Sequence, residues 1–370
     1  MMKPATSDEL YQDRIPPHVS RSFALTIPQL PTELRTPVSN AYLLCRIADT
    51  IEDESALSVE DTLMSLQRFV SVVHGRYDAR LLARDILPQL SRRTSPAERE
   101  LVSNMERVIR TASLQEFQRR AIERCVDAMC GGMHQFQRIA SLHGLPRMKD
   151  LDQYCYYVAG VVGELLTELF CGYAETVAQR RSALEGLAVS FAQGLQKTNI
   201  LKDIWEDRVQ GACWLPQEVF TRYGIDLARL SARELDAQFA AALSELVGVA
   251  HTHLRNALSF TLLIPAEEAG IRRFCLWAIG LAVLTLRNIE RSPGFTDGRQ
   301  VKVSHTGVAM TRILTSISVR HDGMLRQLFE WAARGLPLAS AATVPRASPP
   351  PQHNRGDALA PQARRVIPDA

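Results

Sequence analysis

The sequence predicts an all-α protein, and two observations support this fold class. Apolar residues recur at helical spacing from about Thr36 to about Phe329, within long segments rich in Ala, Leu, Arg, Gln and Glu. Alternating runs of β-branched residues, which are typical of strands, are few. An apolar content of 46% in 370 residues also provides enough apolar side chains for a large core.

Helix breakers give the predicted boundaries in the first half of the chain. Pro28 and Pro31 precede a predicted helix that runs through Asp53. The sequence Gly144-Leu-Pro146 precedes a helix that starts near Asp150. Each breaker lies between apolar segments, so we interpret it as a connection between two helices.

The second half of the chain continues in the same way. The segment from Gly211 to Pro216 follows a predicted helix, and Pro265 precedes another helix from about Glu267 to Ile289. No stretch between Pro28 and Leu338 has the composition of a linker, and no repeat occurs at a fixed period. We therefore predict a single helical domain over residues 1–338.

Residues 339–370 are predicted to be a disordered tail rich in Pro, Ala and Arg. Six of the 19 prolines fall between Pro345 and Pro368, and the segment has no apolar periodicity. Such a composition cannot bury enough apolar surface to offset the conformational entropy lost on folding.

The charge and cysteine content argue against several classes of function. The formal net charge is +3 and no basic run is present, so nucleic acid is not an expected partner. The seven cysteines include no Cys-x-x-Cys pair, which argues against a disulfide framework and a zinc site. Reduced thiols are typical of a cytoplasmic protein, which is the location we predict.

No export signal or transmembrane segment is predicted. The N-terminus lacks the apolar core of a signal peptide. The most apolar stretch, Cys275 to Leu286, has about 12 residues, whereas a helix that spans a bilayer needs about 20.

Two short acidic motifs are the main candidates for function. Both have the pattern Asp-x-x-Glu-Asp, at residues 49–53 and 203–207. On a helix, positions i and i+4 share one face, so the two aspartates of each motif form a pair whose like charges repel. Hard carboxylate oxygens suit Mg²⁺, which keeps water ligands and shares its coordination with phosphates. A solvated acidic helix end is the alternative for either motif taken alone.

Polar residues that precede each motif at helical spacing favour the functional interpretation. The two stripes consist of Tyr42, Arg46, Asp49 and Asp53 on one predicted helix, and Gln196, Asn199, Lys202, Asp203 and Asp207 on another. Because their flanks are apolar, both stripes are predicted to line an interior cavity, where charged groups must be paired or bind a metal ion.

Two carboxylate pairs that face each other across a cavity suggest a Mg²⁺ clamp on a diphosphate group. The ion would neutralise the charge that develops on the leaving group. If the diphosphate leaves an allylic carbon, aromatic faces can stabilise the remaining carbocation by about 0.5 to 2 kcal/mol each. The candidate aromatic residues are Phe23, Tyr42, Tyr154, Tyr157 and Phe274.

These residues resemble a known family, the head-to-head isoprenyl diphosphate synthases that include squalene, dehydrosqualene and phytoene synthases. The resemblance covers most of the chain and is carried by five segments. They are Ser20–Phe23, Tyr42–Asp53, Tyr154–Gly163, Gln196–Asp207 and Pro216–Val219. The squalene branch is the better match, because Asp49-Thr50 and the segments that begin at Gln196 and Pro216 have squalene-type sequence.

The resemblance implies an isoprenoid-synthase-type helical bundle around a central cavity, and the reaction of squalene synthases. Two farnesyl diphosphates condense to presqualene diphosphate, which NADPH then reduces to squalene. The use of NADPH is implied by the resemblance alone, because no Gly-x-Gly-x-x-Gly follows a predicted strand. The alternatives are a cofactor-independent dehydrosqualene or phytoene synthase, an enzyme that stops at presqualene diphosphate or hydroxysqualene, and a non-catalytic helical binding module.

The resemblance also implies roles for individual residues. Tyr154 takes part in the first condensation, as a proton acceptor or as a stabiliser of a cation. The implied ligands of Mg²⁺ are the catalytic aspartates Asp49, Asp53, Asp203 and Asp207, together with Glu52 and Asn199. The implied substrate-binding residues are Ser20, Arg21, Ser22, Phe23, Tyr42, Arg46, Gln196, Asn199 and Lys202.

Two positions depart from the family pattern. The loop from Gly211 to Pro216 lacks an arginine that family members carry there. One of three cations is expected to replace it: Lys197, Lys202 or Arg208. After Phe274-Cys275, the chain continues with Trp277-Ala where animal squalene synthases have Pro-Gln.

The expected partner is farnesyl diphosphate, bound by a monomer or a weak oligomer. A membrane surface is a further expected contact, through basic residues of the tail, because the product is apolar. His251 and His253 have no third metal ligand nearby in the sequence, so we expect them on an exposed helix face rather than in a metal site.

Overall fold

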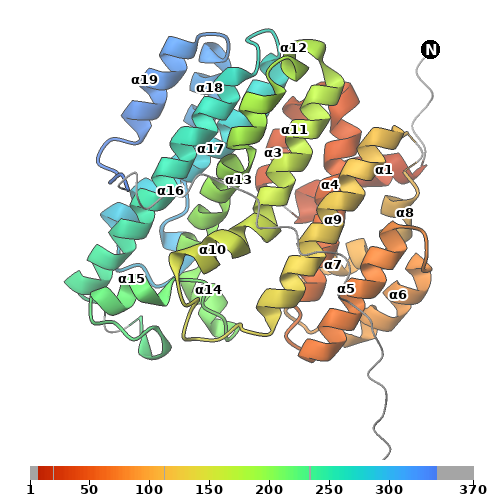
Figure 1. Cartoon of the computed structure of the whole chain (residues 1–370), viewed down its shortest axis with the longest axis horizontal. Helices are drawn as coiled ribbons and strands as arrows, with labels where there is room; N and C mark the ends of the chain where they lie inside the picture. The colour runs from red at the N-terminus through yellow and green to blue at the C-terminus, as the bar shows by residue number, and fades with distance from the viewer. Residues whose placement is uncertain (1–6, 20, 112, 233–234, 340–370) are drawn as a thin grey trace, which may run out of the picture.

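The computed structural model describes residues 7–19, 21–111, 113–232 and 235–339, and within these ranges every regular element is a helix, as predicted (Figure 1). The first helices are α1 (Ser7–Arg14), α2 (Pro16–Val19), α3 (Arg21–Thr26), η1 (Ile27–Gln29), α4 (Thr32–Glu52), α5 (Val59–Val73), α6 (Ala79–Ile86), η2 (Leu87–Gln89), α7 (Pro96–Ser103), α8 (Met105–Ile109) and α9 (Glu116–Gln137). The remaining helices are α10 (Met148–Cys155), η3 (Tyr156–Gly160), α11 (Val161–Tyr173), α12 (Glu175–Ala178), α13 (Arg181–Lys202), α14 (Ile204–Val209), α15 (Gln217–Arg222), η4 (Leu227–Arg229), α16 (Ala237–Leu263), α17 (Ala269–Arg291), η5 (Gly298–Gln300), α18 (His305–Ser318) and α19 (Asp322–Ala332).

Long helices that pack side by side form the centre of the molecule (Figure 1). Helix α13 packs along α16 on one side and against α11 on the other, and α11 in turn contacts α9 and α4. Buried apolar residues from Tyr11 to Ala333 form one contiguous core cluster. Helices α4 and α13, whose C-terminal ends carry the two acidic motifs, therefore belong to the same bundle.

The predicted helix boundaries agree with the structure to within about two residues. Pro31 occupies the N-cap of α4, and α10 and α17 begin at Met148 and Ala269. Proline and glycine fix these boundaries through local backbone chemistry, which does not depend on tertiary contacts. The predicted tail lies outside the described residues, apart from Ala339.

Two described helical segments are long and apolar enough to cross a membrane, Met148–Tyr173 and Ala269–Arg291. The 12-residue apolar stretch that we considered too short lies inside the second of them. More than half of each apolar window, 56% and 67%, is buried within the bundle, as in the core helices of other folded domains. The expectation that no segment is long and apolar enough to span a bilayer is therefore corrected, because two described segments meet this length and most of each apolar window is buried.

A close crossing of α11 and α13 depends on a glycine. A Cβ atom on Gly163 would lie 2.2 Å from the carbonyl oxygen of Ala188, which is much closer than any real van der Waals contact. The glycine therefore permits the backbones of the two helices to approach.

We predict that Gly163→Ala lowers the free energy of unfolding by about 1 to 3 kcal/mol, because the two helices must separate to accept the methyl group. The matched control is Gly186→Ala on the exposed side of α13, where nothing lies within 4 Å of the new Cβ. This control should be neutral or stabilising by up to about 1 kcal/mol. Urea denaturation of both variants tests the expectation, and equal stabilities would contradict it.

Candidate active site

The first acidic motif occupies the last turn of α4. Asp49 lies within the helix and Asp53 forms its C-cap, with its backbone N–H donated to the carbonyl of Asp49 at 2.8 Å. The Arg46 guanidinium lies 3.8 Å from the Asp49 carboxylate and also pairs with Glu98 of α7. Because one guanidinium serves two carboxylates, Asp49 is only partly neutralised.

The second motif lies across a helix junction rather than on one continuous helix. Helix α13 ends at Lys202, Asp203 separates it from α14, and Asp207 lies in α14. The Asp207 N–H still donates to the Asp203 carbonyl at 2.9 Å, so the predicted i, i+4 relation is kept across the junction. The Lys202 ammonium pairs with the Asp203 carboxylate.

The structure brings the two motifs together. Burial, followed by the charges of Asp203 and of Asp53 from the first motif, raises the pKa of the Asp207 carboxyl to about 8. Burial and the charges of Glu52, Asp53 and Asp207 also raise the pKa of the Tyr154 hydroxyl well above its ordinary value. Tyr154 therefore experiences the field of both motifs, although they lie far apart in the sequence.

The carboxylates of the first motif resist ionisation in the same way. Asp49 is half-buried and Asp53 is exposed at the surface, but the protein packed around the two carboxylates reduces their hydration. This raises the pKa of Asp49 to about 7, against the opposing effect of Arg46, and the pKa of Asp53 to about 6. Burial and both aspartates raise the pKa of Glu52 well above its ordinary range, and its Oε1 atom has no hydrogen-bond partner among the described residues. An added cation would relieve this repulsion.

The donor set suits a metal ion that is shared with a phosphate-containing ligand. Within the described ranges, no three His, Cys, Asp or Glu side chains are close enough to form a metal cage by themselves. Mg²⁺ does not need such a cage, because it commonly binds one or two carboxylates and completes its octahedron with water and substrate phosphates. Two carboxylate pairs that face each other fit this requirement.

Of the three cations expected to replace the missing arginine, only Lys202 pairs with an acidic motif. The Arg208 guanidinium donates instead to the carbonyls of Leu227 and Leu230, both at 2.8 Å. Lys197 is buried, and its ammonium lies 2.8 Å from the Asp152 carboxylate of α10. Lys197 and Arg208 point to other elements, so Lys202 is the one of the three alternatives that lies at an acidic motif.

The two histidines of α16 are buried, which corrects our expectation of an exposed face. His251 and His253 are 3% and 1% exposed. The ammonium of Lys197 can only donate, so the His253 Nε2 atom, 3.2 Å away, accepts, and Nδ1–H donates to the Ser190 hydroxyl at 2.8 Å. The His251 Nδ1–H donates to the carbonyl of Pro337 at 2.7 Å. Packing of α16 against α13 and against the segment around Pro337 buries a surface that the sequence suggested was open.

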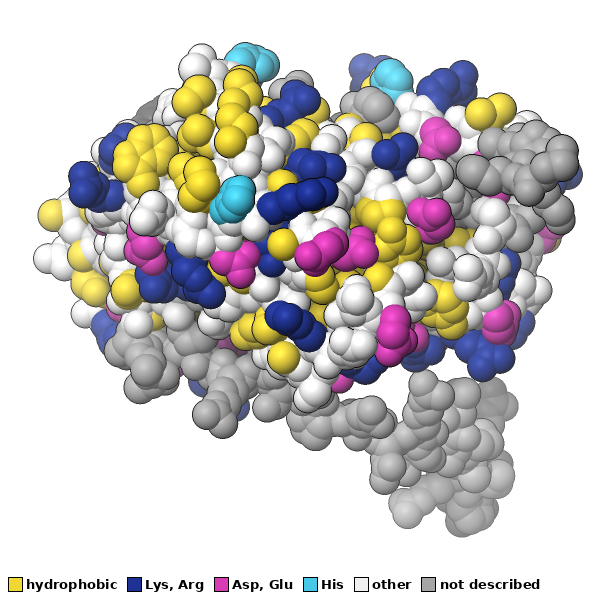
Figure 2. Space-filling view, turned by 90° about the horizontal axis from the view of Figure 1, so that it is seen from above, with side chains coloured by type: hydrophobic (Ala, Val, Ile, Leu, Met, Phe, Trp, Pro, Cys, Tyr) yellow, Lys and Arg dark blue, Asp and Glu magenta, His cyan; other side chains and the backbone are white. Residues whose placement is uncertain are grey.

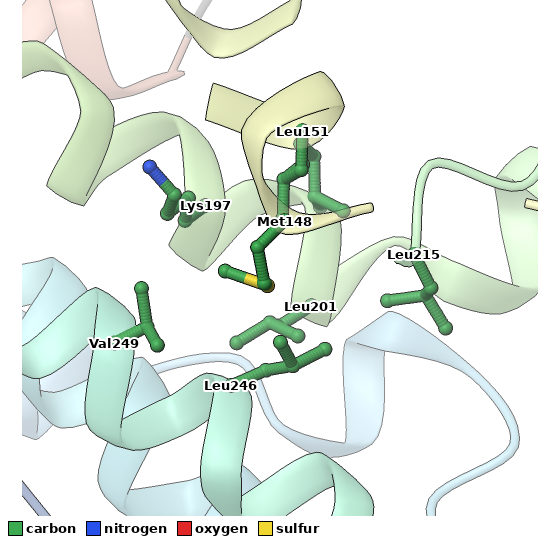
Figure 3. A pocket seen from close by; sticks show the side chains of 8 residues that line it. Met148, Leu151, Lys197, Leu201, Leu215, Leu246 and Val249 are labelled. Atoms are coloured by element: carbon green, nitrogen blue, oxygen red, sulfur yellow. The ribbon is translucent and has the colours of Figure 1, made fainter. Parts of the chain in front are cut away.

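A small apolar cavity lies beside this buried network (Figure 3). Its volume is about 10 Å³, the space of a single water molecule, and Met148, Leu246 and Val249 are among its lining residues. Figure 3 shows the Lys197 ammonium pointing away from these apolar side chains. The cavity is too small for a substrate and lies apart from the acidic motifs.

Aromatic side chains flank the site near Tyr154. The Tyr154 ring stacks on Trp214 with a centroid distance of 4.1 Å and an interplanar angle of 9°, and Phe136 packs edge-on at 5.3 Å. Tyr157 lies 6.4 Å from the same Phe136 ring. Phe274, by contrast, is buried in the core against Phe170.

The other predicted substrate-binding residues are only partly described. Phe23 and Tyr42 pack with ring centroids 4.7 Å apart, which brings α3 to α4. Gln196 is half-buried and Asn199 is exposed on the last turns of α13, beside Lys202. Ser20 lies outside the described residues, and of Arg21 and Ser22 only the backbone is described, within α3.

Our sequence interpretation missed several residues that position the site. Glu98 holds Arg46, and Trp214 stacks on Tyr154 from the loop that lacks the expected arginine. Gly298 donates its N–H to Glu206 at 2.9 Å, and a Cβ there would lie 2.8 Å from the carbonyl of Lys202. The Trp in the loop was visible in the sequence, whereas the other contacts join segments too distant for any local pattern to indicate.

We predict that the metal-free protein loses stability as the pH rises from about 4 to about 8. The folded-state pKa of Asp207 lies above its ordinary value of 3.8, so the folded state holds a proton in this range that the unfolded state releases. Asp207→Asn removes this effect. The variant should match the wild type near pH 4 and have the higher melting temperature above pH 8, both measured with EDTA.

The exposed Glu60→Gln on α5 serves as the control and should not alter the pH dependence of the melting temperature. A melting temperature of Asp207→Asn that follows the wild type at every pH would show that folding does not raise the pKa of Asp207.

Comparisons with known proteins identify the family. The chain matches the squalene/phytoene synthase family over residues 16–306. It is 30% identical over 302 residues to a squalene synthase of Cyberlindnera jadinii, an alignment that covers 80% of this chain and 65% of that protein. The chain thus spans about two thirds of the length of this relative.

Solved structures show the same fold. A ligand complex of TcSQS superposes with a TM-score of 0.68 at 23% identity, over 90% of this chain and 99% of that one. A dehydrosqualene synthase in complex with a ligand has a TM-score of 0.60 at 22% identity, over 86% and 97% of the two chains. With the two facing acidic motifs and the match over residues 16–306, these findings show that the chain belongs to the squalene/phytoene synthase family.

Proposed function

We propose that this protein is a squalene synthase, a farnesyl-diphosphate farnesyltransferase. It condenses two farnesyl diphosphates to presqualene diphosphate, which NADPH then reduces to squalene. The observation that carries the proposal is that the two motifs act on the same groups: the charge of Asp53 helps to raise the pKa of Asp207, and the charges of both help to raise the pKa of Tyr154. Family membership agrees with this reaction class.

The acidic residues bind the diphosphate end of the substrates. Asp49, Asp53, Asp203 and Asp207 would hold Mg²⁺, with Glu52 and Asn199 as further oxygen ligands. Mg²⁺ held by these residues would supply the positive charge that the departing diphosphate needs. Arg46 and Lys202 contribute direct positive charge, and Glu98 fixes the orientation of Arg46.

Tyr154 stabilises positive charge during the condensation. The C–C bond forms as one diphosphate leaves, and the released diphosphate, which is itself a base, takes up the proton that is lost when the cyclopropane closes. Because the pKa of Tyr154 is raised well above its ordinary value, its phenol stays protonated at neutral pH, which favours a cation stabiliser over a proton acceptor. Stacking on Trp214 holds the ring in one plane, and an aromatic face stabilises a cation by about 0.5 to 2 kcal/mol.

The proposal also includes the reduction by NADPH, the cellular location and the oligomeric state. The rival reactions are cofactor-independent synthesis of dehydrosqualene or phytoene and release of presqualene diphosphate or hydroxysqualene. The proposed location is cytoplasmic, in agreement with seven buried free thiols, and the proposed state is a monomer or weak oligomer.

We expect Asp203→Asn to lower kcat by several orders of magnitude without loss of folding, because the variant keeps the size of the side chain but removes a ligand charge. Steady-state kinetics with farnesyl diphosphate and Mg²⁺, together with thermal melting, measure both effects. Glu60→Gln is the matched exposed control. A kcat within about tenfold of the wild type would contradict the metal role of Asp203.

Product analysis tests the reductive step. Incubation with farnesyl diphosphate and Mg²⁺ should yield squalene only when NADPH is present, because the rearranged cation needs a hydride. Formation of the same hydrocarbon at the same rate with and without NADPH would contradict squalene synthesis and indicate a cofactor-independent reaction. Hydroxysqualene would indicate that water quenches the cation.

A further inference from the structure

Helix α18 buries polar side chains and exposes apolar ones, which is the opposite of an ordinary surface helix. The residues that it buries are Thr311 and Ser318, and Thr311 packs closely on Gly280 of α17. The side chains that it exposes include Met310, Ile313 and Ile317, which are 46%, 53% and 67% accessible. A surface helix normally turns its aliphatic stripe toward the core.

Neighbouring elements extend this apolar surface. Of the twelve large apolar side chains that are exposed in the described ranges, six lie on α18, on α19 and just after α19. We call these six residues the α18–α19 face: Met310, Ile313, Ile317, Met324, Trp331 and Leu338. Figure 2 shows apolar side chains gathered on the left of this view, with basic, acidic and His side chains around them. Several exposed apolar side chains on neighbouring helices are typical of an interaction site.

The charges around the α18–α19 face are mainly positive. The arginines of this segment are Arg312, Arg320, Arg326 and Arg334, all of them exposed. Its two acidic residues are already paired, Asp322 with Arg272 at 2.7 Å and Glu330 with Arg255 at 2.8 Å. An anionic partner is therefore favoured over a neutral or cationic one.

We propose that the α18–α19 face docks the enzyme on an anionic lipid bilayer. Aliphatic side chains would enter the boundary between headgroups and acyl chains, Trp331 would lie at the interface, and the arginines would contact lipid phosphates. A second copy of the chain is a poorer occupant because two positive surfaces repel. Residues 340–370 are also a poorer occupant, because they carry four arginines against two aspartates and only four large aliphatic residues.

The location of this face suits the proposed reaction but does not depend on it. Gly298 contacts Glu206 of the second motif, Lys302 lies near Asp203, and α18 starts at His305. Only a few residues therefore separate the acidic site from the docking helix. An enzyme with an apolar product gains from this proximity to a bilayer.

Sedimentation with lipid vesicles tests the proposal. The full chain should bind vesicles of phosphatidylcholine mixed with phosphatidylglycerol and bind pure phosphatidylcholine much less. Ile313→Ser/Ile317→Ser should lower the partition coefficient by at least about tenfold, with unchanged melting temperature. The matched control is Leu81→Ser/Ile139→Ser, which removes two exposed apolar side chains elsewhere and should bind as the wild type.

Three outcomes would overturn the proposal. Wild-type vesicle binding by Ile313→Ser/Ile317→Ser would exclude the α18–α19 face. Loss of a lipid-free dimer in this variant, measured by analytical ultracentrifugation, would assign the face to self-association. Loss of vesicle binding only after deletion of residues 340–370 would assign docking to that segment. Because the assay measures binding alone, its result is independent of the proposed reaction.

Discussion

Carboxylates from two distant segments face each other in this protein, and nearby side chains neutralise them only in part. Arg46 divides its charge between Asp49 and Glu98, and Lys202 pairs with Asp203 alone. Repulsion between charges is several times stronger in a partly dehydrated site than in water. The acidic site therefore opposes folding at neutral pH, and the rest of the bundle must hold it in place. A divalent cation with a diphosphate would remove this conflict.

Contacts behind the site provide the required rigidity. Gly163 permits close packing of α11 on α13, which fixes the helix that ends in the second motif. The ion pair of Asp152 with Lys197 links α10 to the same helix. Asp152 precedes Tyr154 by two residues, and Lys197 precedes Asn199 by two. One buried link thus sets the position of Tyr154, the proposed catalytic tyrosine, relative to the second acidic motif, and removal of either partner would leave an uncompensated buried charge.

The proposed substrate has a charged diphosphate head and an apolar chain, and two different regions of the protein suit them. The acidic site suits a charged diphosphate head, whereas the α18–α19 face suits the apolar phase into which a hydrocarbon product passes. The loop around Gly298 contacts the second motif and leads directly into α18. The inference about this surface is drawn from α18 itself, which buries Thr311 and Ser318 and exposes Ile313 and Ile317.

The sequence alone determined the helical class, the boundaries at Pro31 and Pro265, and the two acidic pairs, because proline chemistry and i, i+4 spacing are local properties. Local spacing also placed Arg46 beside Asp49 correctly. Local spacing did not predict the surroundings of Lys197 and His253, whose side chains join a buried network of three helices. Only the tertiary structure decided that network, the stacking of Trp214 and the contact of Gly298, because which helix covers a given face depends on segments far away in the chain.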